Sequence, residues 1–347
     1  MVCTMISLRA LLSSARTLRP GPGHAAGLPS DDAVLLDAPD EQLSPALVAA
    51  ALGDFGPAAK LLATTRDAAD WETRDRRLSR LTAFAQGRDG WLTGWLAASP
   101  RDPDALLVKA ELAVRRAWAS PAHAELLREI GPLITAAAEA DPRDPVPWRL
   151  ALDHARGTHA PHTVFESLWE QAVRRSPHHY GSHVAALRYL SAAWYGSHRE
   201  CFDFAERAAE DAAADSLVQA LPVRAAFALL RDERAAARAT SVQRDRIDAA
   251  ADLAIGLSAA FPAGDPWPAE VRNLLAYVLV ARGRTTEALE QFRLIGPYAT
   301  SFPWASVAGE ALGGFLDARA DVRLRAASSG YARYSRRRPE HSGRRGH

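Results

Sequence analysis

One stretch of the chain, residues 178–209, constrains the fold more than any other, because it predicts two helices joined by a very short turn. Its first part repeats large apolar residues at steps of three and four, the spacing of one helix face, at Val184, Leu187, Leu190 and Trp194. Gly196 then stands where a helix commonly ends in a left-handed residue, and Ser197 with Glu200 forms the S-x-x-E pattern that opens a helix. The second helix has an apolar face of its own, at Cys201, Phe204, Ala205 and Ala208. A turn of about two residues forces such helices to lie side by side and antiparallel.

The same stretch resembles a known family. Residues 192–205 read AAWYGSHRECFDFA, which is similar to the signature of an uncharacterised, mainly actinobacterial family known as a domain of unknown function. In that family a Pro-Lys pair precedes the tryptophan and glycine follows it, whereas this chain has Ala192, Ala193 and Tyr195 there. The resemblance covers residues 60–320. It implies a tetratricopeptide-like fold and brings no catalytic residues with it.

Helical periodicity continues along most of the chain, and β-branched residues never form an alternating run, so we predict an all-α protein. The expected helices are 44–52, 57–65, 70–86, 89–98, 103–118, 122–140, 145–156, 162–175, 181–195, 198–213, 216–238, 242–260, 268–282, 284–295 and 303–319. We divide the chain into an irregular lead-in, a helical repeat domain and a basic disordered tail, at 1–40, 41–322 and 323–347.

Internal repeats indicate how these helices are arranged. Prolines break the pattern at Pro100, Pro142 and Pro177, and the last two are 35 residues apart, close to the 34-residue tetratricopeptide unit. Residues 273–292 match that unit best, with small residues, a turn glycine and an aromatic at Ala276, Ala288, Gly283 and Phe292. We therefore predict an α-solenoid of antiparallel helix pairs.

Charge and cysteine content favour a cytoplasmic protein. The net charge is +1, but residues 1–30 carry +3 and residues 328–347 carry +5, so the middle of the chain is acidic. The two cysteines, Cys3 and Cys201, cannot build a disulfide framework. Arg9 interrupts the apolar start that a secretion signal needs, and no apolar run reaches 18 residues. We expect no membrane contact and no cofactor.

Histidines provide the one pattern that resembles a catalytic site. Seven of the eleven lie within 45 residues, at His154, His159, His162, His178, His179, His183 and His198. His179 and His183 are four apart on an expected helix, a spacing that can hold a metal ion. However, no HExxH sequence is present, and no carboxylate accompanies the pairs at ligand spacing. We expect no enzyme, and a metal-dependent enzyme using this cluster is the alternative.

The expected function is non-catalytic binding of a protein or peptide on the concave face. Aligned repeats place residues one and five positions after Trp148 and His183 on that face, and the last repeat adds two more. The predicted groove comprises Arg149, Asp153, Arg156, Arg188, Asn273 and Tyr277. Arginine grips carboxylates bidentately, so we expect an acidic peptide. The alternative is that Asp153 forms an internal salt bridge with a neighbouring arginine.

Three further expectations concern the core and the ends of the chain. We expect Trp194, Phe204 and Phe292 to be buried core residues. Residues 1–35 and 328–347 show no buried face, so we expect both to be dispensable for folding. The arginines at 336–338 could contact nucleic acid, because phosphate contacts need only positive charge, but we expect a plain solvated end.

Overall fold

A computed structural model describes residues 27–336 of the chain, with side chains to residue 328. About 73 % of these residues are helical, in 17 α-helices, and the strands among them are one pair of two-residue segments. The predicted all-α class is confirmed.

The element bounds follow the predicted helices closely. The first nine helices are α1 Leu43–Ala51, α2 Gly56–Asp67, α3 Trp71–Ala85, α4 Gly90–Ala98, α5 Pro103–Trp118, α6 His123–Ala140, α7 Val146–Gly157, α8 His162–Arg175 and α9 Tyr180–Tyr189. The others are α10 His198–Asp211, α11 Leu221–Arg231, α12 Glu233–Ala237, α13 Ser241–Ala259, α14 Ala269–Ala281, α15 Thr285–Ile295, α16 Ser301–Ala308 and α17 Ala311–Arg336. Two 3-10 turns, Asp31–Ala33 and Leu217–Ala220, and strands β1 Leu35–Leu36 and β2 Tyr298–Ala299 complete the set.

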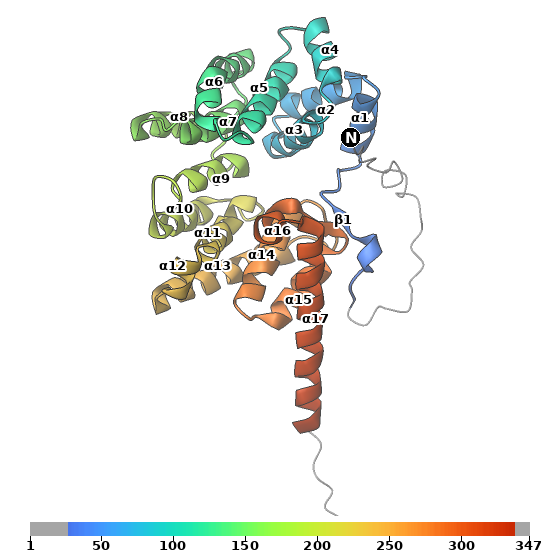
Figure 1. Cartoon of the computed structure of the whole chain (residues 1–347), viewed down its shortest axis with the longest axis vertical. Helices are drawn as coiled ribbons and strands as arrows, with labels where there is room; N and C mark the ends of the chain where they lie inside the picture. The colour runs from blue at the N-terminus through green and yellow to red at the C-terminus, as the bar shows by residue number, and fades with distance from the viewer. Residues whose placement is uncertain (1–26, 337–347) are drawn as a thin grey trace, which may run out of the picture.

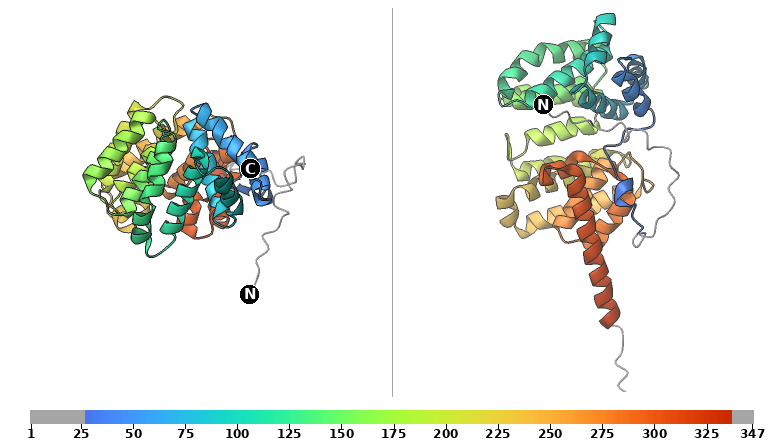
Figure 2. Two further views of the ribbon diagram at one scale, coloured as in Figure 1. Left: turned by 90° about the horizontal axis from the view of Figure 1, so that it is seen from above. Right: turned by 45° about the vertical axis from the view of Figure 1, so that its right-hand side comes forward.

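Helices α1 to α8 form one half of the molecule, and α10 to α17 form the other, with α9 between them (Figure 1). Neighbours in the sequence pack on each other in both halves, as in α1 with α2, α5 with α6, and α14 with α15. Helices α3, α5, α7, α9 and α11 also form a series in which each contacts the next. Seen from above, the helices of the N-terminal half lie over those of the C-terminal half (Figure 2).

Apolar side chains gather in three clusters that follow this arrangement. One joins α1 to α7 and another joins the C-terminal helices, including the fully buried Phe292 and Phe315. A small third cluster, with Phe165 and Tyr189, lies between α7, α8 and α9. The predicted small residues Ala276 and Ala288 are fully buried in the C-terminal cluster.

The helix–turn–helix at residues 178–209 differs from the prediction in its turn. Helix α9 ends at Tyr189 rather than at 195, so residues 190–197 connect it to α10. Gly196 does not have the left-handed backbone that we predicted. Instead, a Cβ there would lie 2.3 Å from the carbonyl oxygen of Leu190, so only glycine fits. Ser197 caps α10 as predicted, and its hydroxyl accepts a hydrogen bond from the backbone of Glu200.

Two long predicted helices are broken. The expected helix 216–238 is interrupted at Asp232, whose carboxylate accepts a bond from Ala235 and opens α12. The expected helix 303–319 is split at Gly309, where φ is 78°. Both breaks come from residues that favour helix ends.

The lead-in is more tightly attached than we predicted. Leu28 and Val34 are buried in the C-terminal apolar cluster, and β1 pairs in parallel with β2. Residues 27–35 therefore have a buried face, contrary to the expectation that this segment contributes nothing to the fold. The rest of the predicted dispensable segment, with Cys3, lies outside the described residues.

The last helix is longer than we predicted. Helix α17 continues to Arg336, beyond the expected boundary at residue 322, and projects from the body (Figure 1). Val322 is buried and Ala326 packs against the C-terminal cluster, so the apolar face extends a turn past the expected end. The predicted disorder of 323–336 is thus replaced by helix, while 337–347 lies outside the described residues.

Candidate functional site

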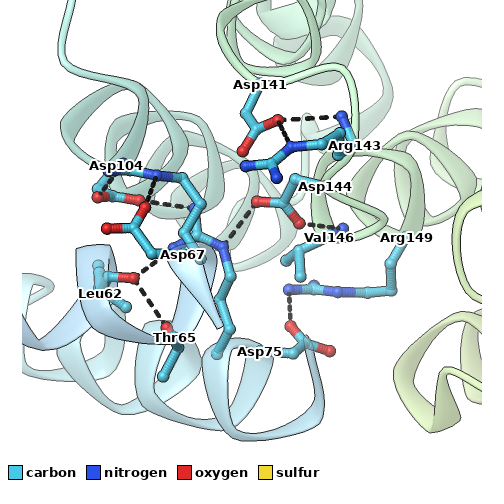
Figure 3. Close-up of polar contacts among 12 residues, drawn as sticks. Leu62, Thr65, Asp67, Asp75, Asp104, Asp141, Arg143, Asp144, Val146 and Arg149 are labelled. Atoms are coloured by element: carbon cyan, nitrogen blue, oxygen red, sulfur yellow. Dashed lines mark hydrogen bonds and ion pairs between the residues drawn. The ribbon is translucent and has the colours of Figure 1, made fainter. Parts of the chain in front are cut away.

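Four of the six predicted groove residues lie together on α7 and α9. Arg149 donates from Nη2 to Asp75 at 2.6 Å (Figure 3). It also donates from Nη2 to Glu111 at 2.7 Å, and thereby joins α7 to α3 and α5. Burial alone would lower the pKa of Arg149, but these two carboxylates outweigh burial and raise it. Arg149 is therefore a permanently charged link inside the protein.

Asp153 lies one turn further along α7 and makes the internal salt bridge that we gave as the alternative. Its Oδ1 accepts from Arg156 Nη2 at 3.1 Å and lies 3.9 Å from Arg188 Nη1. Burial alone would raise the pKa of Asp153, but Arg188, Arg156 and Arg149 hold it below its usual value. Asp153 is thus ionised and neutralised by protein arginines, so it is not available to a basic ligand.

Arg156 is held between two tryptophans, one of them from the family-like sequence. Its guanidinium carbon lies 4.3 Å from the ring centre of Trp118 and 4.6 Å from that of Trp194, within the range of cation–π attraction. Gly157 permits this, because a Cβ there would lie 2.6 Å from the Trp118 ring. Trp194 is half-buried rather than fully buried as predicted, and so is Phe204. The role of Trp194 is to hold Arg156 beside Asp153.

Arg188 differs from the other arginines of this cluster. Half of its side chain (51 %) is exposed, and its ion pair with Asp153 is too long for a hydrogen bond. Nevertheless burial lowers the pKa of Arg188, with Asp153 acting against that shift. Exposure and desolvation occur together when a side chain is surrounded by protein on most sides and still open to water, as in a hollow.

The charges that act on Arg188 come from both halves of the molecule. Besides Asp153 and Arg156 on α7, they include Arg224 on α11 and Glu270 on α14. Arg224 is paired with Glu270 and donates to the Tyr180 hydroxyl at 3.3 Å. We infer a hollow beside the half-exposed Arg188, among these charged residues, and call it the central hollow.

Other contacts between the halves were not found from the sequence. Arg76 on α3 donates to the carbonyl of Trp267 at 2.6 Å, and its guanidinium lies 3.7 Å from the centre of that ring. On the intervening helix α9, Tyr180 donates from its backbone N–H to Glu72 of α3, and burial raises the pKa of Glu72. Residues 76 and 267 are 191 apart in the sequence, and no periodicity links them.

The two predicted groove residues of the last repeat do not belong to this site. Asn273 is fully buried, and its amide donates to the carbonyls of Ala269 and Tyr298 and accepts from the Trp304 indole. Tyr277 is half-buried beside Phe227 and Trp304. The prediction for Asn273 is wrong because a buried amide must satisfy its own hydrogen bonds.

The two histidines with metal-like spacing, His179 and His183, are engaged by protein atoms. His179 caps α9 and lies 3.4 Å from Asp75, whereas His183 donates from Nδ1 to the backbone carbonyl of His179. Burial lowers the pKa of His183 to about 4. Within residues 27–336, no group of three His, Cys, Asp or Glu side chains is placed to hold a metal ion.

No family model, curated protein or solved structure matches the chain. The likeness of residues 192–205 to the family of unknown function therefore stays an expectation. In the described part of the chain, no helix combines the length and apolar character needed to cross a bilayer.

Proposed function

We propose that the chain is a tetratricopeptide-like α-solenoid that binds an acidic peptide or protein segment in the central hollow, without catalysis. The serial contacts from α3 through α5, α7, α9 and α11 support the repeat arrangement, because stacked helix pairs give one continuous inner layer. That inner layer supplies Arg149, Arg156 and Arg188.

The observation that carries the proposal is the state of Arg188. Arg149, Arg156 and Arg224 each donate a hydrogen bond to a protein carboxylate, whereas the contact described for Arg188 is one long ion pair. Its guanidinium is open to water in a hollow where burial already disfavours its charge. A ligand carboxylate would stabilise the charged form of Arg188 and accept two hydrogen bonds from its guanidinium.

The neighbouring residues have supporting roles in this proposal. Arg149 links three helices. The two tryptophans hold Arg156 beside Asp153, so Asp153 already accepts a hydrogen bond from Arg156. Asp153 therefore orients Arg188 without fully satisfying it. A basic ligand would face Arg188 as a like charge, which gives the site its preference for acidic sequences.

The test is binding of fluorescent hexaglutamate, followed by anisotropy, to the intact chain and to Arg188→Ala. We expect the variant to bind on the order of tenfold or more weakly, the loss typical of a hydrogen bond to a charged group. Arg199→Ala is the matched control, because Arg199 is 86 % exposed on α10 and pairs with Asp203 within its own helix. Hexaglutamate with an amidated C-terminus separates recognition of side chains from recognition of a free terminus. Equal binding by all three proteins would refute the proposal.

A further inference from the structure

The lead-in joins the two halves of the molecule on the side where β1 meets β2. Its first part is anchored in the C-terminal half, where Leu28 and Val34 are buried in the apolar cluster. The backbone N–H of Leu35 donates to the carbonyl of Pro297 at 2.7 Å, and that of Asp37 donates to Ala299 at 2.8 Å. In Figure 1, β1 lies beside the last helices, which come more than 200 residues later in the sequence.

Asp37 fastens the lead-in to both halves at once. Its carboxylate accepts from Arg80 on α3 at 2.9 Å and from the backbone N–H of Ser301 on α16 at 3.0 Å, and the Ser301 hydroxyl also donates to it. Asp40 accepts from Arg77 on α3 at 3.1 Å. The lead-in therefore crosses from the C-terminal core to α3 and is bonded on each side.

Asp37 also has a left-handed backbone, with φ at 52°. A residue with a Cβ adopts this conformation at an energetic cost, so the surrounding contacts must hold it in place. Loss of the Asp37 carboxylate removes those contacts and leaves the strained backbone unsupported. Asp37 is thus the residue through which one substitution removes the lead-in's bonds to Arg80 and Ser301 together.

We infer that residues 28–40 form a strap that controls access to the central hollow by fixing α3 against β2 and α16. The charges around Arg188 come from α7 on one side and from α11 and α14 on the other, so the spacing of the two halves sets the width of the hollow. Arg76 with Trp267 is a second contact between the same two halves. Release of the strap widens the entrance, and closure retains what has entered. This inference names the regulation of the proposed binding site and rests on that proposal for its biological use.

Access to the hollow can be measured without any ligand. In a Cys3→Ser background, Arg188→Cys places a thiol in the hollow. The native Cys201 should not react with either reagent, because burial raises the pKa of its thiol to about 12. A small reagent, iodoacetamide, reports intrinsic reactivity, and a bulky polyethylene-glycol maleimide reports opening. Asp37→Ala releases the strap. Asp32→Ala is the control, since Asp32 is exposed on the same segment.

We expect Asp37→Ala to raise the rate of bulky labelling on the order of tenfold, as a loss of about 1.4 kcal/mol of strap stability would give. The small reagent should react equally in all proteins, and Asp32→Ala should match the parent. Ser301→Ala removes one hydrogen-bond donor to Asp37 and should give a smaller rise in the rate of bulky labelling. It replaces Asp37→Ala in the test if that variant does not fold. Unchanged bulky labelling in the folded strap variants would overturn the inference. Peptide binding is measured separately, in the chain that keeps Arg188. A rise in labelling together with no hexaglutamate binding by that chain would refute the proposed function alone.

Discussion

Arg74 is the residue whose replacement should destabilise the fold most clearly through charge burial. Its guanidinium is 1 % exposed and donates to Asp144 at 2.7 Å and to the carbonyl of Leu62 at 3.0 Å, and it lies 2.7 Å from Asp104. Arg74→Met retains most of the apolar stem but removes the charge. Breaking a buried ion pair by deleting one partner costs about 3–5 kcal/mol, because the remaining charge is left unpaired.

A matched exposed pair provides the control. Arg116 lies 2.8 Å from Asp89, with both side chains about half exposed. Because water screens such a pair, Arg116→Met should change the free energy of unfolding by at most about 1 kcal/mol. Urea denaturation followed by far-UV circular dichroism measures both variants.

The same comparison has a pH dependence. Burial raises the pKa of Asp104 even with Arg74 beside it, and removing Arg74 raises that pKa further. A carboxyl whose pKa is higher in the folded than in the unfolded state makes the folded state bind protons more readily, so stability rises as pH falls toward that pKa. The deficit of Arg74→Met should therefore be smaller at pH 5 than at pH 7. The reasoning would be refuted if Arg74→Met lost no more stability at pH 7 than Arg116→Met.

Three more predictions concern other parts of the fold. His183 is a base whose pKa is lowered to about 4, so stability should fall as pH drops from about 6.5 to about 4, and His183→Gln should flatten that decline in urea titrations. Gly196→Ala should destabilise the folded protein by about 1–3 kcal/mol, because the new Cβ would overlap the Leu190 carbonyl. Gly256→Ala, in open space within α13, should instead stabilise it by about 0.5–1 kcal/mol. Equal effects of the two substitutions in thermal unfolding would contradict the close approach of Gly196 to Leu190. Removing residues 1–38 should lower the thermal midpoint because two buried apolar side chains are lost, and an unchanged midpoint would show that the lead-in adds no stability.

The sequence predicts the helices well because each depends on local spacing and on residues that open or close a turn. Ser197 at the start of α10 and Gly283, with φ at 71°, before α15 are examples of such local signals. The errors arise where contacts with atoms outside the local pattern determine where a helix ends. Helix α9 ends early because the chain folds back onto the carbonyl of Leu190, which the residue types alone do not reveal.

The candidate site divides in the same way. Arg149, Asp153 and Arg156 share α7, so their spacing places them together, and Arg188 lies on α9, which packs against α7. Asn273 could not be predicted correctly, because its partners Tyr298 and Trp304 come from a later segment. Long-range contacts such as these determine which polar residues are consumed inside the protein and which stay available to a ligand.

The most direct test of the account is a charge exchange at Arg188. We predict that Arg188→Glu loses binding of hexaglutamate and gains binding of hexalysine. The replacement puts a second carboxylate beside Asp153, so the central hollow then favours basic rather than acidic peptides. Fluorescence anisotropy with both labelled peptides, at low and at physiological salt, measures the exchange. Retained binding of hexaglutamate by the folded variant, with no gain for hexalysine, would contradict the claim that Arg188 in the central hollow recognises acidic ligands.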